Sequence, residues 1–309
     1  MIYTIASNLH LVPLNQPTLT GFDDFIGAWV HRGDPPFVVD PGPAATIPDL
    51  IAALEALDVR RPAAIFLTHI HIDHAGGTGD LLARYPETPV ICHSAGIRHL
   101  ADPAKLWAGS LKTLGKTAEA YGPIGPVPAD LLRAADGPVD IGGDEPVVPI
   151  LTPGHAPHHV SYRFGEFLFG GEAAGVFADL PGDRFYLRPA TPPRFFLETS
   201  VESLDALIRT PHTRFLFGHF GATRRTPELL TTHRAQLHFW AETIRREMAR
   251  RDPSHPDFPD RCIETLLATD PLLAEWPSLP TDVRHRERGF LKNAVAGFTG
   301  YLQSDAASA

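Results

Sequence analysis

The sequence has little cysteine and no long hydrophobic run, and both absences narrow the class of protein. It contains two cysteines, Cys92 and Cys262, too few for the disulfide framework of a small secreted domain. No apolar stretch approaches the roughly 20 residues that a membrane-spanning helix needs. The first residues also lack the basic and apolar segments of a signal peptide. We therefore expect a cytoplasmic protein with no membrane partner.

Basic residues are also too few for a nucleic-acid surface. The chain has 27 Lys and Arg against 36 Asp and Glu, which gives a formal net charge of −9. A phosphate backbone attracts proteins of the opposite charge, so we expect no nucleic-acid partner. The hydrophobic fraction of 43% over 309 residues is ordinary for a globular protein with an ample core.

What the sequence does have is a dense cluster of metal-ligand side chains in residues 69–74, where three histidines and one aspartate fall within six positions. The cluster follows a short apolar segment, 63–67, that is typical of a buried strand. It precedes a predicted helix at 80–85. Strand–helix alternation of this kind predicts an α/β fold, and the carboxyl end of a strand is a usual place for its site.

The spacing inside the cluster suggests two ions. His69 and His71 are two residues apart on an extended backbone, so their side chains point the same way and can chelate one ion. Asp73 and His74 follow where the chain turns, so they can point at a second ion nearby. Neutral imidazole and carboxylate groups are ligands that suit zinc, iron and manganese.

Three later strand ends carry further ligand-type residues, namely His155, Glu172 and His219. Strand ends on one edge of a sheet converge on one place. We therefore expect two ligand groups, with Glu172 as the bridge between them. The first group is His69, His71 and His155, and the second is Asp73, His74 and His219.

Together these motifs resemble those of metallo-β-lactamase-fold hydrolases, and the H-x-H-x-D-H form is similar to the glyoxalase II and lactonase branch. The matching segments occur in the family's order at 68–77, 152–155 with His159, 170–172 and 218–219. The resemblance covers about residues 1–225. It implies a four-layer αβ/βα sandwich with a dimetal site at one edge of two packed sheets.

The rest of the chain is predicted to be helical additions to this domain. Residues 95–135 show helical patterns, including 106–121, without a strand between them, and we interpret them as an inserted lid. Residues 226–309 form a predicted C-terminal helical extension that packs on the domain. An apolar face left over on these helices could form a homodimer.

The resemblance implies a metal-dependent hydrolase of small molecules. Two divalent ions, most simply zinc with iron or manganese as alternatives, would lower the pKa of a shared water and yield a bridging hydroxide. The hydroxide would attack the carbonyl of a thioester, a lactone or another ester. Asp73 is the predicted catalytic residue, because it can accept a proton as well as bind metal.

Two other functions are compatible with the same motifs. Persulfide dioxygenases share the H-x-H-x-D-H form but use one iron, which here would be held by His69, His155 and the acid at the bridge position. A regulatory or interaction protein with residual hydrolase activity could instead use the helices at 226–309 as its surface. The bridge is itself a departure, since the family usually has aspartate where this chain has Glu172.

Further residues are predicted to surround the centre. The resemblance implies that Asp40 steadies a ligand histidine. We expect His159 to bond the backbone near the site and not a metal. The candidate lining of the substrate pocket is Tyr121, His158, Phe195 and Phe196.

Overall fold

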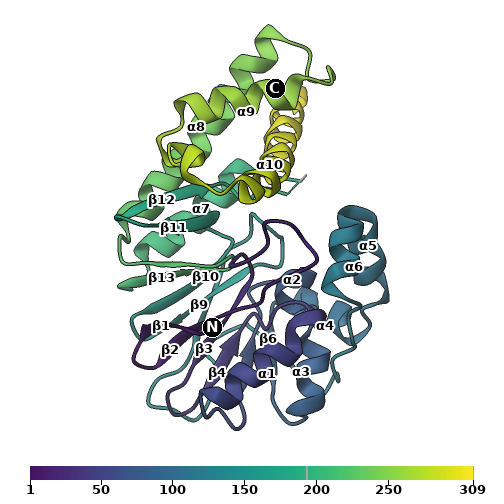
Figure 1. The fold of residues 1–309 in the computed structure, drawn as a ribbon, viewed down its shortest axis with the longest axis vertical. Helices are drawn as coiled ribbons and strands as arrows, with labels where there is room; N and C mark the ends of the chain where they lie inside the picture. The colour runs from purple at the N-terminus through teal and green to yellow at the C-terminus, as the bar shows by residue number, and fades with distance from the viewer. Residues whose placement is uncertain (193, 309) are drawn as a thin grey trace.

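The computed structural model describes residues 1–192 and 194–308. These residues form two large β-sheets with helices on their outer faces, and a separate two-stranded sheet. Figure 1 shows the strands of the two sheets next to each other, and α8, α9 and α10 lie together at one end of the molecule. Within the described residues, no helix combines the length and the hydropathy that crossing a membrane requires.

The first sheet has seven strands in sequence order, from β1 at one edge to β7 at the other. The pairs β4–β5, β5–β6 and β6–β7 are parallel, and the pairs before them are antiparallel. The strands are β1 (Tyr3–Ala6), β2 (Leu9–Pro13), β3 (Gly27–His31), β4 (Phe37–Val39), β5 (Ala64–Phe66), β6 (Val90–Cys92) and β7 (Leu132–Ala134).

The second sheet has five strands in the order β14-β13-β10-β9-β8, and a separate hairpin pairs β11 with β12. Strands β10 and β13 are parallel, so their carboxyl ends lie at the same edge. The strands are β8 (Val148–Leu151), β9 (Val160–Phe164), β10 (Phe167–Gly171), β11 (Val176–Leu180), β12 (Arg184–Arg188), β13 (Arg214–Phe217) and β14 (Ala222–Thr223).

Helices follow or connect these strands. The α-helices are α1 (Ile47–Ala56), α2 (Ile72–Ala75), α3 (Thr78–Arg84), α4 (Ser94–Ala101), α5 (Ala104–Leu114), α6 (Lys116–Tyr121), α7 (Leu197–Arg209), α8 (Glu228–Arg250), α9 (Phe258–Thr269) and α10 (Thr281–Ser308). Three single-turn 3-10 helices are η1 (Ala44–Thr46), η2 (Pro271–Leu273) and η3 (Trp276–Ser278).

The alternation of apolar side chains along buried strands divides the interior into three cores. Successive residues of a strand point to opposite faces of its sheet. In β3, Trp29 therefore faces the core between the two sheets, whereas Ala28 and Val30 face the core beneath α1, α3 and α4. In β10, Phe169 faces the core between the sheets and Leu168 faces α7 and α8.

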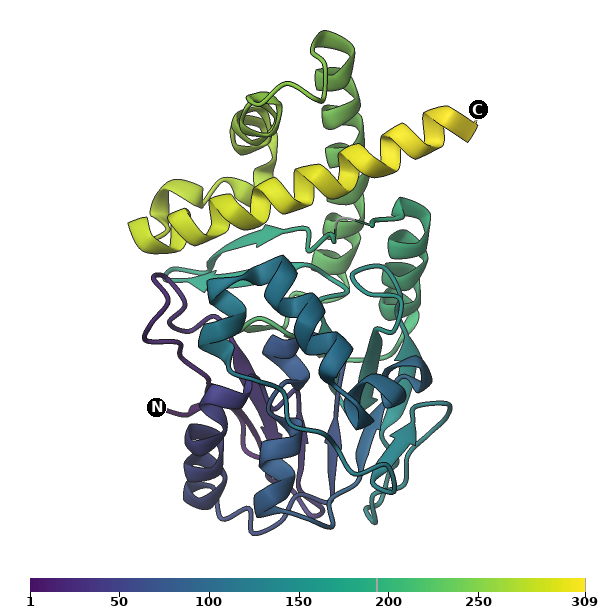
Figure 2. The same ribbon diagram turned by 90° about the vertical axis from the view of Figure 1, so that its right-hand side faces the viewer.

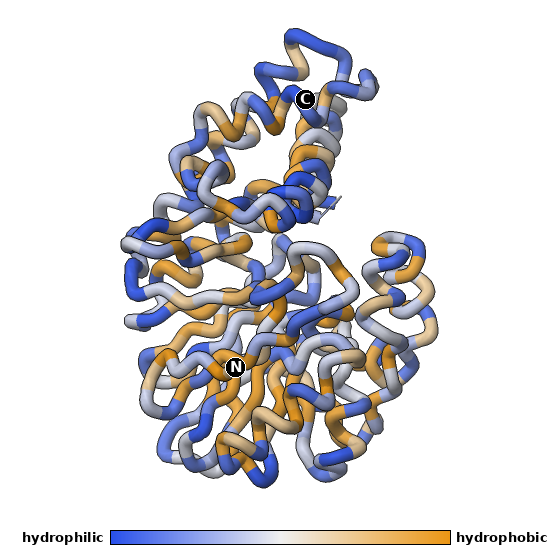
Figure 3. The backbone as a smooth tube through the Cα atoms, viewed as in Figure 1, coloured by the Kyte–Doolittle hydropathy of each residue, from blue (hydrophilic) through white to orange (hydrophobic). Residues whose placement is uncertain are grey.

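Three cores separate four layers, which confirms the predicted αβ/βα sandwich with C-terminal helices. Figure 2 shows α10 running across one end of the molecule, above the hairpin. In Figure 3 the hydrophobic colour is concentrated in the strands and on the inward sides of the helices. The predicted boundary at 225 and the predicted homodimer stay predictions.

The insertion at 95–135 differs from its prediction in two places. It is not purely helical, because β7 (Leu132–Ala134) pairs in parallel with β6 and forms an edge of the first sheet. The helix predicted at 106–121 is two helices, α5 and α6, because Gly115 between them has φ of +54°, which a continuous right-handed helix does not allow. The segment is therefore a bent pair of helices, and its role as a lid stays a prediction.

A buried ion pair ties α10 to the hairpin. The carboxylate of Glu287 accepts hydrogen bonds from the Arg188 guanidinium, and the two side chains are 1% and 3% exposed. Arg286 also donates to Glu287. Removal of one member of a buried ion pair leaves the other charge buried without a partner, and this lowers the stability of the folded protein strongly.

We expect Glu287→Gln to lower the free energy of unfolding by about 3–5 kcal/mol, because the arginines lose their shared counter-charge. Urea denaturation followed by circular dichroism measures this change. Glu264→Gln is the matched control, since Glu264 bonds Arg288 at the surface with its side chain 61% exposed. Its expected cost is below about 1 kcal/mol. Equal stability of the two variants would contradict this role of Glu287.

Candidate metal centre

The candidate metal centre lies at the edge where strands from both sheets end. His69 and His71 lie in the turn after β5, and α2 carries Asp73 and His74. Hydrogen bonds join the sheets here: Val160 N–H donates to the Thr68 carbonyl at 2.7 Å.

Three other chain segments meet the cluster from the second sheet. His155 lies in the turn between β8 and β9, Glu172 directly follows β10, and His219 follows β13. Because β10 and β13 are parallel neighbours, Glu172 and His219 emerge at the same edge. All seven residues that the sequence suggested as ligands thus lie together.

The first group consists of His69, His71, His155 and Glu172, whose ligand atoms all lie within 4.8 Å of one another. His155 Nε2 lies 3.0 Å from Glu172 Oε2 and 3.0 Å from His71 Nδ1. His69 Nε2 lies 3.4 Å from the same Glu172 oxygen. Three imidazoles and a carboxylate therefore converge on one point.

The second group consists of Asp73, His74 and His219, again with ligand atoms within 4.8 Å of one another. The Asp73 Oδ2 atom lies 3.7 Å from the Nε2 atoms of both His74 and His219. Glu172 reaches this group as well, with Oε2 at 3.5 Å from His74 Nε2 and Oε1 at 3.2 Å from His219 Nε2. Glu172 therefore lies between the two groups, and its side chain, which is longer than that of the aspartate usual in the family, reaches both.

The chemistry of the donor atoms fits divalent cations. Within the part of the chain that the structure describes, the buried Nε2 atoms of His69 and His74 make no hydrogen bond, and the Glu172 Oε2 atom lies 3.4 and 3.5 Å from them. Burial lowers the pKa of His69 well below its usual range and that of His71 to about 3, so both rings are neutral. A neutral imidazole offers a lone pair to a metal.

Carboxylates make the centre attractive to positive charge. Burial alone would raise the pKa of Glu172, but His155 and His219 hold it well below its usual range. Burial lowers the pKa of His155, yet the Glu172 carboxylate raises it above its ordinary value. The raised pKa favours a proton on His155, which the Glu172 carboxylate stabilises. A metal ion bound to both residues would replace that proton, so metal binding here would release protons.

Asp40 fixes the orientation of one candidate ligand from behind. Its buried carboxylate accepts hydrogen bonds from the Thr68 backbone N–H at 2.7 Å and the Thr68 hydroxyl at 2.6 Å. His74 Nδ1–H donates to the same carboxylate at 3.2 Å. Burial lowers the pKa of His74, but Asp73, Asp40 and Glu172 raise it well above its usual value. The bond to Asp40 keeps a proton on Nδ1, so Nε2, which faces Asp73 and Glu172, is the atom left for a metal.

His159 fixes the backbone at the bridge. Its Nε2 accepts the N–H of Glu172 at 3.1 Å, and its Nδ1 lies 2.8 Å from the Thr152 hydroxyl. Gly171 has φ of +55°, and a Cβ there would lie 2.4 Å from His159 Nε2. The glycine before Glu172 is thus required by the turn and by this close approach.

A comparison with known protein families identifies the family of this chain. The sequence model of the metallo-beta-lactamase superfamily matches residues 28–219. The chain belongs to the metallo-beta-lactamase superfamily. This confirms the resemblance that the motifs indicated. The matched range begins in β3 and ends at His219, so it contains every candidate ligand.

Individual members of the superfamily agree with this assignment. A metallo-beta-lactamase fold-containing protein of Sulfurisphaera tokodaii is 30% identical over 74% of this chain and 84% of its own length. The hydroxyacylglutathione hydrolase of Salmonella typhi is 27% identical over 66% of this chain and 65% of its own length. That of Pectobacterium carotovorum is 29% identical over 48% of this chain, which spans about half of that relative, at 47%.

Solved structures of the superfamily share the fold. The crystal structure of an archaeal metallo-beta-lactamase superfamily protein, from Sulfolobus tokodaii, has a TM-score of 0.68 at 23% identity, with 95% of this chain and 99% of that chain covered. A metallo-beta-lactamase family protein from Thermus thermophilus has a TM-score of 0.64 at 21% identity, with 98% and 96% covered. The match extends over the C-terminal helices as well as the sandwich.

Two of the four residues predicted to line the substrate pocket, His158 and Tyr121, lie within the electric field of the centre. His158 lies near the first group, with its ring centroid 6.0 Å from that of His71, and burial lowers its pKa to about 4. Tyr121 is 2% exposed, and burial followed by the charge of Asp73 raises its pKa well above the usual range. Both therefore lie in the electrostatic surroundings of the centre.

The two phenylalanines do not share this position. Phe195 packs in the core under the C-terminal helices, with its ring centroid 4.5 Å from that of Phe298. Phe196 is 61% exposed. The structure thus places His158 beside the first ligand group, whereas Tyr121 and Phe195 both lie in hydrophobic cores. Their role as pocket lining stays a prediction.

Two residues beside the centre carried no signal in the sequence. The Phe25 ring stacks on the His219 imidazole, with centroids 4.3 Å apart and an interplanar angle of 17°. The Arg286 guanidinium lies 3.8 Å from the centroid of the same ring. Phe25 precedes β3 and Arg286 lies in α10, so only the tertiary fold reveals their proximity.

Proposed function

We propose that the chain is a dinuclear metal-dependent hydrolase that cleaves a thioester, a lactone or another ester. The observation that carries this proposal is the position of Glu172, whose two oxygens contact histidines of both ligand groups. The relatives named hydroxyacylglutathione hydrolase support a thioester as one substrate class. Zinc is the proposed metal, because imidazole and carboxylate sets suit it. The cytoplasm is the proposed compartment, consistent with two free, buried cysteines.

The centre would hold one ion with His69, His71 and His155, a second with Asp73, His74 and His219, and both with Glu172. Two bound dications supply a water of lowered pKa and an electrophile for the carbonyl oxygen. The protein's own part is to fix the donors and to handle protons.

Asp73 is the proposed proton acceptor of the reaction. Its side chain is 17% exposed, whereas those of His74 and Glu172 are 1% and 6% exposed, so Asp73 is the most accessible of these three. A carboxylate in this position can take the proton that the attacking water loses and pass it on to the leaving thiolate or alkoxide. No serine or cysteine nucleophile is needed for this sequence of steps.

Removal and return of metal tests the proposal directly. Purified protein is assayed with a panel of thioesters, lactones and phosphodiesters before and after dialysis against a chelator, and again after zinc, manganese or iron is restored. We expect thioester or other ester cleavage to disappear on dialysis and to return with one of these metals. Cleavage that survives full metal removal would contradict the proposal, and so would oxygen uptake with a single iron and no hydrolysis.

A further inference from the structure

The ring of His219 is held differently from those of the other candidate ligands. Three of the other histidines have a hydrogen bond on the ring nitrogen that faces away from the ligand groups: His69 with the Thr68 hydroxyl at 3.0 Å, His74 with Asp40 at 3.2 Å and His155 with the Ala190 carbonyl at 2.9 Å. The Nδ1 atom of His219 is buried and has no hydrogen-bond partner among the described residues. Since such a bond usually orients a metal-binding histidine, the orientation of His219 depends on a different contact.

An aromatic ring lies flat against the His219 imidazole. The Phe25 side chain is 3% exposed, and its ring stacks on the imidazole with centroids 4.3 Å apart and an interplanar angle of 17°. A stacked contact in a close-packed interior restricts rotation of the imidazole, because a tilted imidazole would collide with the neighbouring ring. The stack therefore keeps Nε2 of His219 directed at Asp73 and Glu172, whose nearest oxygens lie 3.7 and 3.2 Å away.

A cation of the C-terminal helix holds Phe25 from its other face. The Arg286 guanidinium lies 3.8 Å from the centroid of the Phe25 ring. Two groups this close to one centroid fit only on opposite faces, so Phe25 lies between Arg286 and His219. The electrons of an aromatic face attract a guanidinium, and this attraction stabilises Phe25 in the position where it stacks on the imidazole.

Arg286 is in turn fixed to its surroundings. Its side chain is 7% exposed, and it donates hydrogen bonds to Glu287 and to the Gly21 carbonyl. Gly21 has φ of +80°, and a Cβ there would lie 2.5 Å from the Asp282 carbonyl oxygen. The segment that carries Phe25 is therefore packed closely against the start of α10.

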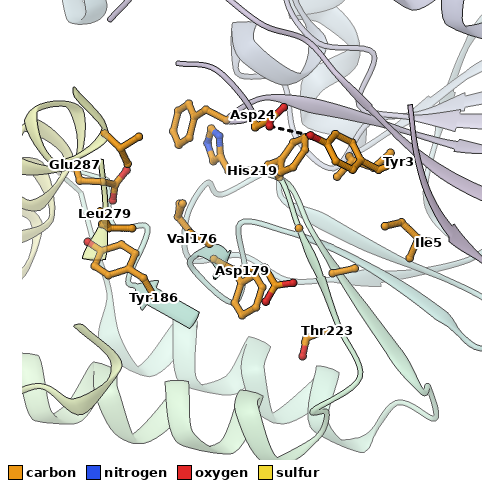
Figure 4. A pocket seen from close by; sticks show the side chains of 18 of the residues that line it. Tyr3, Ile5, Asp24, Val176, Asp179, Tyr186, His219, Thr223, Leu279 and Glu287 are labelled. Atoms are coloured by element: carbon orange, nitrogen blue, oxygen red, sulfur yellow. Dashed lines mark hydrogen bonds between the residues drawn. The ribbon is translucent and has the colours of Figure 1, made fainter. Parts of the chain in front are cut away.

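The pocket beside the centre shows the same proximity of the C-terminal region to His219. Figure 4 shows Glu287 of α10 and Leu279, which precedes that helix, facing the same space as His219. The match to the superfamily model ends at His219, whereas Arg286 lies in the helices that follow the sandwich. A series of contacts that begins in these helices thus reaches a candidate ligand through one ring.

We propose that Phe25 is the positioning residue of His219, and that Arg286, acting through Phe25, makes α10 a determinant of metal affinity at the second ligand group. The inference rests on the proposed function, since it concerns the same dinuclear centre. Without the stack, His219 is free to turn away from Asp73 and Glu172. Loss of Phe25 should therefore weaken the binding of the second ion far more than that of the first.

Zinc affinities measured by competition with a chromophoric chelator test the proposal without relying on turnover. The full chain should show two dissociation constants. Phe25→Leu should weaken one of them by about 10–100-fold and change the other by less than about twofold, as for the loss of a group that orients a metal ligand. Phe25→Tyr keeps the ring and should stay within about threefold of the unaltered protein. Cadmium-113 NMR assigns the weakened site, whose signal should be the one that His219→Ala removes.

A double variant separates action through Phe25 from a direct effect of Arg286. Arg286→Met alone should weaken the same site by about 3–10-fold, because Phe25 loses its cation–π contact. Added to Phe25→Leu, the same change should weaken the site no further, because the ring through which Arg286 acts is gone. Full additivity of the two changes would contradict this order of contacts.

Phe258→Leu is the matched control, because Phe258 is 2% exposed and lies in α9, in the core under the C-terminal helices. It should lower the stability of the protein but leave both zinc affinities unchanged. Equal weakening of both sites in Phe25→Leu would overturn the proposal, and so would two unchanged affinities. If Phe25→Leu does not fold, an unchanged second site in Arg286→Met would overturn it. Absence of ester cleavage together with the expected affinities would refute only the proposed hydrolase.

Discussion

Alanine in place of Asp73 should lower kcat/KM for the cleaved ester or thioester by at least about a thousandfold, because one residue serves two roles. Its carboxylate lies 3.7 Å from both histidines of the second group, so its loss removes that group's acid. The same change removes the proposed proton acceptor. Initial rates measured alongside metal content per chain separate the two effects.

The control for this variant is Asp257→Ala, since Asp257 is 71% exposed and lies before α9, away from the centre. It should keep the full rate and the full metal content. If Asp73→Ala loses one metal per chain and nearly all activity, both roles stand. Activity within tenfold of the unaltered protein would show that Asp73 is neither a needed ligand nor the proton acceptor.

The second large effect is expected at a residue that touches no metal. Asp40→Ala should weaken the binding of metal by about 10–100-fold, because His74 loses the acceptor that fixes its ring. The Thr68 N–H and hydroxyl lose their acceptor as well. Competition with a chromophoric chelator measures the affinity of each site.

Asp40→Asn gives an informative comparison. The amide oxygen can still accept the Thr68 N–H, but the amide group offers His74 a weaker acceptor than a carboxylate. We therefore expect an affinity between those of the unaltered protein and Asp40→Ala. Unchanged affinity in Asp40→Ala would mean that the packing around His74 alone fixes its ring.

Glu172 shows how a departure from the family's usual residue is accommodated. Its side chain is one methylene longer than aspartate, yet both of its oxygens reach candidate ligands, at 3.0 Å to His155 and 3.2 Å to His219. The backbone before it is held by Gly171 in a left-handed conformation and by the hydrogen bond to His159. The extra length therefore extends across the gap between the two groups.

The sequence was most informative where chemistry is local. His69, His71, Asp73 and His74 are close in sequence, so their proximity needs no knowledge of the fold. His155 and His219 could be placed because each follows an apolar strand, and strand ends in such sheets meet at one edge. The alternation within β3 and β10 likewise follows from the period of two in a strand.

The sequence was least informative where tertiary contacts decide. β7 is three residues long, and its sequence shows no strand pattern; pairing with β6 determines its conformation. The contact of Arg286 with Phe25 joins positions far apart in the chain, and no periodicity relates them. Phe195 could equally have lined a pocket or a core, and its contact with Phe298 in α10 places it in the core.

The most direct test of the account is the number of metal ions that each chain binds, measured by elemental analysis of purified protein and of its Glu172→Ala variant. The account predicts two ions per chain in the unaltered protein and fewer in the variant, because Glu172 contacts both ligand groups. One tightly bound ion at every metal concentration, unaffected by the change at Glu172, would contradict a dinuclear centre.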